Sequence, residues 1–268
     1  MKKLRIGAPG HLAARPLVFG LMRNSGAEVD LVYDEPGRLA ERLDRGNLDA
    51  ALIPSIEFLR GVGRDYIHGP ALIGGMHTRS LILVTGGDPS SMGRVAVNEN
   101  SRTPLAVLRI VLDKLYDNTP DFCVFKGDPE KWCEGYDGVL LTGDRGLDYC
   151  LEHSDGNVRL YDLGEMWAAL FPEPLVLSLW AYNDEGLGNR LQELLASSRN
   201  FGIQNLSLLS DGVARTSPYD GTLLYDYFAT SWKYHLGGEE EEGLKVLEQH
   251  AYAYQLIRQL RLGKVLTA

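Results

Sequence analysis

A chain of 268 residues, 44% of them hydrophobic, is long enough for one large α/β domain or two lobes of ordinary size. Its apolar runs all fall short of the roughly 18 residues that a membrane span needs, so a membrane span is excluded. The formal net charge of −9 argues against nucleic acid as a partner, yet it leaves room for a small anion held by a few local cations and backbone amides.

The cysteines and the first residues indicate a reducing compartment. Cys123, Cys133 and Cys150 are odd in number and lack the close pairing of a zinc site, so we expect reduced thiols and no metal. Residues 1–3 lead straight into strand-like residues, and Arg5 interrupts the apolar run that a signal peptide would need. We therefore expect a cytoplasmic protein.

Short apolar segments alternate with amphipathic ones over residues 4–182. The predicted strands are residues 4–8, 29–33, 50–53, 80–84, 94–97, 138–141 and 175–182, and the predicted helices are residues 17–23, 37–45, 56–60, 103–116 and 146–153. This βαβα order predicts an α/β fold with a largely parallel sheet and helices on both faces.

The pattern changes after residue 182. Apolar residues recur at helical spacing over residues 187–198, 219–235 and 239–261. This predicts a helical C-terminal segment that has no strand of its own and packs on the first lobe. The acidic run at residues 239–242 is expected at a helix N-terminus, where the helix dipole favours acids.

Two β-rich segments, residues 81–87 and 175–183, could carry the chain between two lobes. If both cross, residues 1–86 and 178–268 form lobe 1, and residues 87–177 form an inserted lobe 2. Two crossovers make a hinge, and a hinge between α/β lobes makes a cleft that closes on a ligand.

Several loops at the ends of predicted strands carry glycine, hydroxyl and charged residues. In chain order they hold Gly10 and His11, then Ser55, then Ser101 to Thr103, then Thr142 to Asp144. The last three loops open helices, whose free N–H groups and positive dipole ends suit a carboxylate or phosphate. The alternative interpretation is that these residues are ordinary helix caps, each worth about 1 kcal/mol of stability. Parallel strands aim the loops at one edge of a sheet, which favours an anion-binding site.

Short motifs occur in the order in which one known family carries them. They are RIGA (5–8), RPL (15–17), ALIPSIEFLR (51–60), RSLIL (79–83), NSRT (100–103), LTGDRGL (141–147), YDLGEMW (161–167) and LVLSLWA (175–181), followed by residues 232–236, which match a late helix of that family. Over nearly its whole length the chain resembles the chorismate dehydratases of the futalosine route to menaquinone. The resemblance implies a two-lobed α/β fold like the type II periplasmic binding proteins, with a hinge cleft, used in the cytoplasm.

The resemblance also implies a reaction, the hydro-lyase elimination of water from chorismate to give 3-[(1-carboxyvinyl)oxy]benzoate. The implied partner is this small dicarboxylate, with no nucleic acid, membrane, metal or organic cofactor. Aromatisation of the ring drives the reaction, and the enolpyruvyl carboxylate of the substrate is placed to act as the base. Matched by position, the substrate-binding residues are Ser55, Ser80, Ser101, Arg102, Thr103, Gly143 and Asp144.

The first loop departs from the family pattern. Where the family has Ser-Tyr-Leu-Asn, this chain has Gly10-His11-Leu12-Ala13. The methyl group of Ala13 cannot donate the hydrogen bond expected of the family's asparagine, and the loss of one such donor lowers a rate about 10²–10³-fold. His11, at the tyrosine position, is the candidate catalytic residue, as a hydrogen-bond donor or a general acid.

Three hypotheses follow from this departure. The chain is a chorismate dehydratase in which His11 or other groups compensate for Ala13, or it is a non-catalytic or altered-ligand paralogue that closes on a small carboxylate without converting it. The third is the related dihydroxynaphthoate synthase of the same pathway. The segments at residues 79–80, 101–103 and 142–144 fit the dehydratase better than the synthase.

Overall fold

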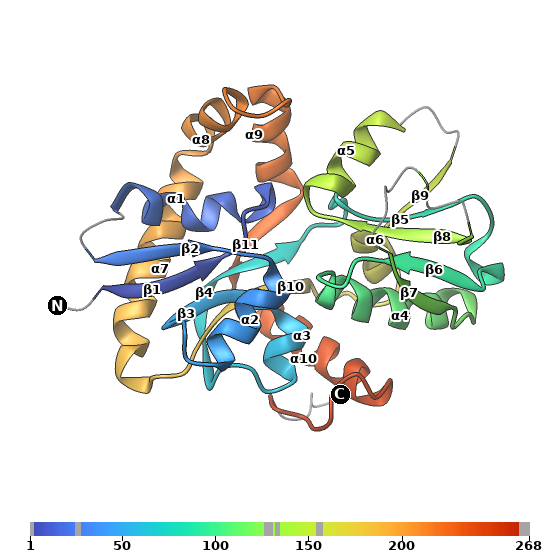
Figure 1. Ribbon diagram of the computed structural model, residues 1–268, viewed down its shortest axis with the longest axis horizontal. Coiled ribbons are helices and arrows are strands. Elements are labelled where there is room, and N and C mark those ends of the chain that lie inside the picture. The colour runs from blue at the N-terminus through green and yellow to red at the C-terminus, as the bar shows by residue number, and fades with distance from the viewer. Residues whose placement is uncertain (1–2, 25–27, 126–130, 132–134, 154–157, 263–268) are drawn as a thin grey trace.

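The computed structural model describes residues 3–24, 28–125, 131, 135–153 and 158–262. Within these ranges the strands form two sheets that lie side by side (Figure 1), and we call each sheet with its helices a lobe. The sheet of lobe 1, in the order β11-β4-β10-β3-β1-β2, consists of β1 (Leu4–Ala8), β2 (Val29–Tyr33), β3 (Ala50–Pro54), β4 (Asp65–Gly74), β10 (Leu175–Tyr182) and β11 (Trp232–Leu236). The sheet of lobe 2, in the order β7-β6-β8-β5-β9, consists of β5 (Leu81–Thr85), β6 (Arg94–Val97), β7 (Asp121–Val124), β8 (Gly138–Thr142) and β9 (Arg159–Asp162).

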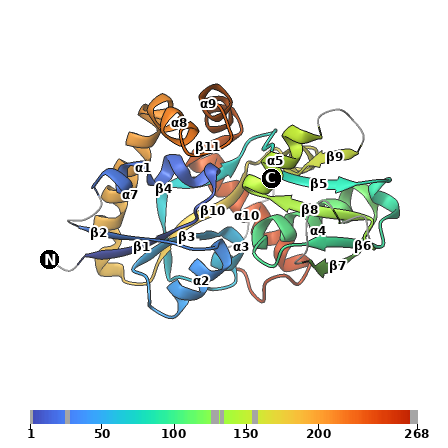
Figure 2. The ribbon, with the colours of Figure 1, turned by 45° about the horizontal axis from the view of Figure 1, so that its top comes forward.

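Helices cover both faces of each sheet (Figure 1, Figure 2). In lobe 1, α1 (Arg15–Asn24) and α7 (Gly188–Gln204) pack together on one face, and α2 (Pro36–Asp44), α3 (Ser55–Leu59) and α10 (Gly238–Ala253) lie on the other. A hairpin of α8 (Leu206–Ala214) and α9 (Gly221–Thr230) stands beside α1. In lobe 2, α4 (Arg102–Tyr116) and α6 (Leu163–Ala168) lie on one face and α5 (Asp144–Glu152) on the other. Short 3₁₀ turns are η1 (Leu12–Ala14), η2 (Pro89–Ser91) and η4 (Glu185–Leu187).

The sheet of lobe 1 is mixed, although we expected a largely parallel one. β1 pairs in parallel with β2 and β3, as the βαβ order predicts. β10 is antiparallel to β3 and β4, and β11 is antiparallel to β4. These later strands enter the sheet only after the chain has passed through lobe 2, so no single βαβ crossover sets their direction.

The C-terminal segment contains a strand where we expected only helix. The prediction that residues 232–236 form a late helix is wrong, because Trp232, Tyr234 and Leu236 are buried while the two residues between them are exposed. Burial with a period of two belongs to a strand with one face on the core. β4, β7 and β9 were also missing from the predicted strands.

Strand pairing shows where the chain passes between the lobes. All of β5 belongs to the sheet of lobe 2, although the predicted boundary assigns residues up to 86 to lobe 1. All of β10 belongs to lobe 1, although the boundary at residue 178 divided it. Since α6 packs on β5 and β9, we propose that the crossovers are residues 75–80 and 169–174.

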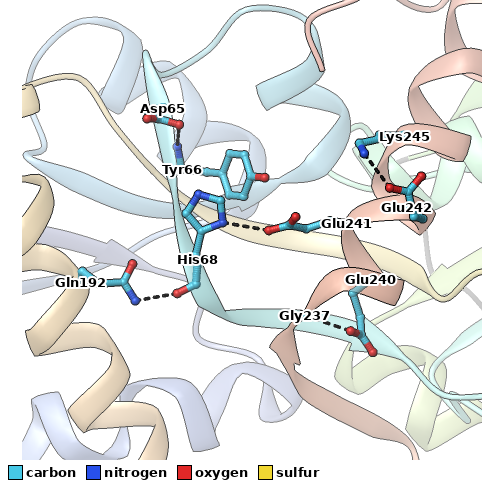
Figure 3. A network of polar contacts seen from close by, with 9 residues as sticks. All are labelled: Asp65, Tyr66, His68, Gln192, Gly237, Glu240, Glu241, Glu242 and Lys245. Atoms are coloured by element: carbon cyan, nitrogen blue, oxygen red, sulfur yellow. Dashed lines mark hydrogen bonds and ion pairs between the residues drawn. The ribbon is translucent and has the colours of Figure 1, made fainter. Parts of the chain in front are cut away.

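The acidic run lies at the N-terminus of α10, as the sequence predicts. Glu240 Oε2 accepts the backbone N–H of Gly237 at 3.0 Å, and Glu241 Oε1 lies 2.8 Å from His68 Nδ1 of β4 (Figure 3). The first contact closes the turn that opens α10 and the second fastens α10 to β4, so the run has a structural role.

Two of the cysteines, Cys123 and Cys150, are free and half-buried, and Cys133 lies outside the described residues. None of the helices in the part of the chain that the structure describes is both long enough and apolar enough to span a bilayer.

Candidate functional site

A cleft of about 710 Å³ lies where the two lobes meet. Its walls follow the carboxyl ends of β1, β2 and β3 in lobe 1 and of β6 and β8 in lobe 2. β5 and β10 run in the opposite direction, so their first residues reach the same edge. Leu81 pairs with Thr142, and Ser178 pairs with Pro54. The cleft therefore occupies the edge of the sheets at which α/β folds bind ligands.

His11 lies in the lobe 1 wall, directly after β1. It occupies the N-cap position of η1, and its Nδ1 is buried with no hydrogen-bond partner among the described residues. Burial and the nearby charge of Arg15 lower the pKa of His11 to about 4. The imidazole is therefore neutral at pH 7, with one N–H to donate and one lone pair to accept.

An apolar residue and a cation follow His11 closely in the chain. Ala13 lines the cleft and is 1% exposed, so its methyl group forms an apolar spot on the wall. Arg15 begins α1, and its buried Nε has no partner within the described ranges. The positive charge of Arg15 acts to lower the pKa of His11, and it opposes the effect of burial on the pKa of Asp144.

Asp144 joins the two walls. It is the first residue of α5, and its Oδ1 accepts the backbone N–H of Leu12 at 2.8 Å. Burial raises the pKa of the Asp144 carboxyl, while the Leu12 hydrogen bond and the charge of Arg15 act in the opposite direction. The N-cap of α5 is Gly143, whose φ of 67° lies in the left-handed region that favours glycine. The side chain of Asp144 thus accepts a hydrogen bond from the opposite lobe and does not cap its own helix.

The hydroxyl residues at the start of α4 also reach other elements. Ser101 is the N-cap residue, but its Oγ lies 2.8 Å from Thr142 Oγ1 and makes no capping hydrogen bond. Thr103 Oγ1 accepts the backbone N–H of Ile56 from lobe 1 at 3.2 Å. The Ser101 hydroxyl therefore contacts the neighbouring end of β8 in its own lobe and the Thr103 hydroxyl contacts the facing lobe, which is not the behaviour of ordinary helix caps.

Arg102 is the cation at the start of α4. Its Nη1 lies 3.8 Å from Glu57 and its Nη2 lies 4.0 Å from Glu41, both in lobe 1. The buried Nε of Arg102 has no partner in the part of the chain that the structure describes. Ion pairs of this length are weak, so an anion in the cleft can compete for the guanidinium.

Ser80 lies in the first crossover and lines the cleft. Its Oγ is 2.7 Å from the hydroxyl of Tyr227 on α9, and both residues are fully buried. α5 approaches this segment so closely that a Cβ at Gly146 would lie 2.4 Å from the Ser80 carbonyl oxygen. The position of Ser80 is thus fixed by both lobes.

The structure brings most of the sequence-predicted residues together. Those that line the cleft are His11, Ser80, Ser101, Arg102, Thr103, Gly143 and Asp144. Ser55 does not line it; this residue begins α3 directly behind the lining residue Pro54, and its buried Oγ has no partner among the residues described.

Sequence reasoning missed several further lining residues, among them Tyr33, Asn98, Ser178 and Trp232. Tyr33 ends β2 and Asn98 directly follows β6, so the strand-end rule could have found both. Trp232 begins an antiparallel strand and Ser178 lies in the middle of another, and that rule covers neither position. Among the described residues no three His, Cys, Asp or Glu side chains are grouped as metal ligands.

Comparison with known proteins places the chain in a family. Residues 4–253 match the family described as menaquinone biosynthesis. A chorismate dehydratase of Thermus thermophilus is 26% identical to this chain, over 93% of this chain and 95% of that protein.

Solved structures show the same fold. Protein AF1704 of Archaeoglobus fulgidus superposes with a TM-score of 0.76 at 16% identity, over 95% of this chain and 98% of that one. The alkanesulfonate-binding protein SsuA of Xanthomonas axonopodis pv. citri, bound to MOPS, gives a TM-score of 0.67 at 17% identity, over 96% and 94%. The expectation of a fold like the periplasmic binding proteins is thereby confirmed. Because the family match extends through both lobes, the chain belongs to the menaquinone-biosynthesis family.

Proposed function

We propose that this protein is a chorismate dehydratase, acting in the cytoplasm on the futalosine route to menaquinone. It converts chorismate into 3-[(1-carboxyvinyl)oxy]benzoate and water. The observation that carries the proposal is the likeness to the Thermus thermophilus relative over 93% of this chain, since it spans both walls of the cleft. A cleft of about 710 Å³ is within the range that encloses a small organic ligand.

The walls offer the groups that a dianion needs. Arg102 supplies a planar guanidinium, which binds a carboxylate through two parallel hydrogen bonds. The hydroxyl pair of Ser101 and Thr142 lies beside it, at the positive end of the α4 dipole. We therefore assign one carboxylate of the substrate to this corner of the cleft.

The reaction breaks the bond between the ring carbon and its hydroxyl group, and it removes a ring proton. The electrons of the C–H bond complete the aromatic ring, and the hydroxide and a proton leave as water. The enolpyruvyl carboxylate of the substrate accepts the ring proton and returns it to the departing hydroxide, which leaves as water, so the cleft needs no strong protein base. The protein has to hold the dianion and assist the departure of the hydroxyl group.

His11 is the residue we assign to that assistance. With a pKa of about 4 it enters the reaction as a neutral imidazole, so it acts as an N–H donor to the leaving oxygen and not as an acid that is protonated beforehand. Its Nδ1 has no hydrogen-bond partner among the described residues, so no protein contact through that atom fixes the imidazole.

Incubation of the purified protein with chorismate, followed by chromatography of the products, tests the proposal. We expect the benzoate product from the wild type, a rate about 10²–10³-fold lower in His11→Ala, and a higher rate in Ala13→Asn. His77→Ala removes an exposed imidazole outside the cleft and is the matched control, with the wild-type rate. An unchanged rate in His11→Ala contradicts the role of His11, and absence of product from the wild type refutes the proposed activity.

The methyl group of Ala13 in the cleft wall supports a second hypothesis, a binding protein that closes on a small carboxylate without converting it. Such a protein shows a clear rise in melting temperature with chorismate and forms no product. The same two measurements therefore separate the enzyme from the binding protein.

A further inference from the structure

We propose that Tyr227, on α9 of lobe 1, is a positioning residue that fixes the hydroxyl of Ser80, a buried residue of the cleft wall, as a hydrogen-bond donor to a bound ligand. The inference rests on the proposed function for the identity of the substrate. Ser80 lines the cleft and Tyr227 does not, so Tyr227 acts on a ligand through Ser80.

The proton of Tyr227 determines the direction of the hydrogen bond. Burial raises the pKa of Tyr227, so the phenol keeps its proton. A buried O–H without an acceptor is unfavourable, and Ser80 Oγ, 2.7 Å away, is the acceptor that the structure provides. Tyr227 therefore donates and Ser80 accepts.

The hydrogen of Ser80 must then point elsewhere. The protein acceptor that Ser80 Oγ meets within the described residues is the carbonyl oxygen of Thr78 at 3.4 Å, which is longer than an ordinary O–H···O hydrogen bond. An oxygen of a ligand in the cleft is a better acceptor than this distant carbonyl. A hydroxyl that accepts one hydrogen bond also donates a stronger one, because the two bonds polarise each other.

The surroundings of Tyr227 hold its hydroxyl at this place. The ring packs edge-on against Trp232, with centroids 6.0 Å apart and an interplanar angle of 82°, and the guanidinium of Arg79 lies 5.6 Å from the ring centroid. Arg79 also forms an ion pair of 2.7 Å with Asp226, the residue before Tyr227. Since Arg79 directly precedes Ser80 in the chain, its contacts with Asp226 and the Tyr227 ring hold both partners of the hydrogen bond in place.

A double-mutant cycle tests the proposal. We would measure kcat and KM for chorismate in the wild type, Tyr227→Phe, Ser80→Ala and the double variant, and record the melting temperature of each. Phenylalanine keeps the ring and its packing and removes only the hydroxyl. Tyr227→Phe and Ser80→Ala are each expected to lower kcat/KM about tenfold, with the same division between kcat and KM, and the double variant should be no worse than Ser80→Ala.

Tyr234→Phe is the matched control. Tyr234 is also buried in lobe 1, and its hydroxyl has no partner among the described residues, so this variant should keep kcat/KM within about twofold of the wild type. The proposal is overturned if Tyr227→Phe behaves like Tyr234→Phe, or if the losses of the two single variants multiply in the double variant.

The cycle also separates this proposal from the proposed function. A wild type that binds chorismate without converting it refutes the dehydratase activity. The cycle is then measured through the dissociation constant for chorismate, which each single variant is expected to raise about tenfold. A wild type that neither binds nor converts chorismate overturns both proposals. An active wild type with an unaffected Tyr227→Phe variant overturns only this one.

Discussion

When the pH falls from about 7.5 to about 4.5, the unfolded chain takes up a proton at His11 before the folded chain does. The pKa of His11 is about 4 in the folded protein, because burial and the charge of Arg15 oppose protonation, against 6.5 for an unperturbed histidine. Between these two values the proton stabilises the unfolded state, so folding stability decreases as the pH decreases. Each pKa unit corresponds to about 1.4 kcal/mol, and the whole interval amounts to about 3 kcal/mol.

Urea unfolding at a series of pH values measures this effect. The free energy of unfolding of the wild type should fall more steeply below pH 6.5 than that of His11→Gln, with a difference of between about 1 and 2 kcal/mol at pH 5.5. His77→Gln, in which His11 is intact, should follow the wild type in this part of the profile. If the difference between wild type and His11→Gln does not depend on pH, His11 is not buried as a neutral group and the reasoning is refuted.

Substitutions at three further positions test two contacts between the lobes and the open space around one helix of lobe 1. Asp144→Ala removes the acceptor of the Leu12 N–H and should lower the free energy of unfolding, measured in urea, by about 1–2 kcal/mol. Asp144→Asn keeps an acceptor oxygen, so its free energy of unfolding should fall less. Equal losses in the two variants would contradict this account of the hydrogen bond. Gly146→Ala places a Cβ 2.4 Å from the carbonyl oxygen of Ser80 and should lower the free energy of unfolding by about 2 kcal/mol or more. This variant should also bind chorismate more weakly. A melting curve like that of the wild type would show that α5 can move away. Gly212→Ala, in α8 with open space around it, should instead stabilise the protein by about 0.5–1 kcal/mol, and a loss of stability would mean that this part of α8 is not helical.

Much of the cleft was predictable because its walls follow the ends of strongly apolar strands. Ser101, Thr103 and Asp144 come after such strands, and parallel pairing of β6 with β8 brings them to one edge. Their actual hydrogen bonds were not predictable. The sequence pattern favours helix capping or ligand contact for these residues. In the structure, Asp144 and Thr103 accept hydrogen bonds from backbone N–H groups of the other lobe, and these bonds depend on how the lobes are oriented.

The parts that sequence reasoning missed depend on contacts between distant residues. Ser80 and Tyr227 are 147 positions apart, and no local pattern signals their pairing. β4 contains Gly69 and Pro70, which argue against a central strand, but Pro70 lies opposite an irregularity in the pairing with β11 and is tolerated there. Trp232 begins a strand of five residues, too short to outweigh the helical spacing that runs up to it.

The place of β10 in the sheet of lobe 1 determines the order in which the molecule can fold. β10 lies between β3 and β4, so β4 cannot join the first three strands until residues 175–182 have been made. The strands of lobe 2 are continuous in the chain over residues 81–162, so lobe 2 has shorter loops to close and should form first. In pulse-labelling hydrogen exchange during refolding, the amides of β5, β6 and β8 should be protected before those of β4 and β10. A nascent chain would then carry one finished wall of the cleft well before it has the other, and the ability to bind a ligand would appear only after β10 and β11 have been made.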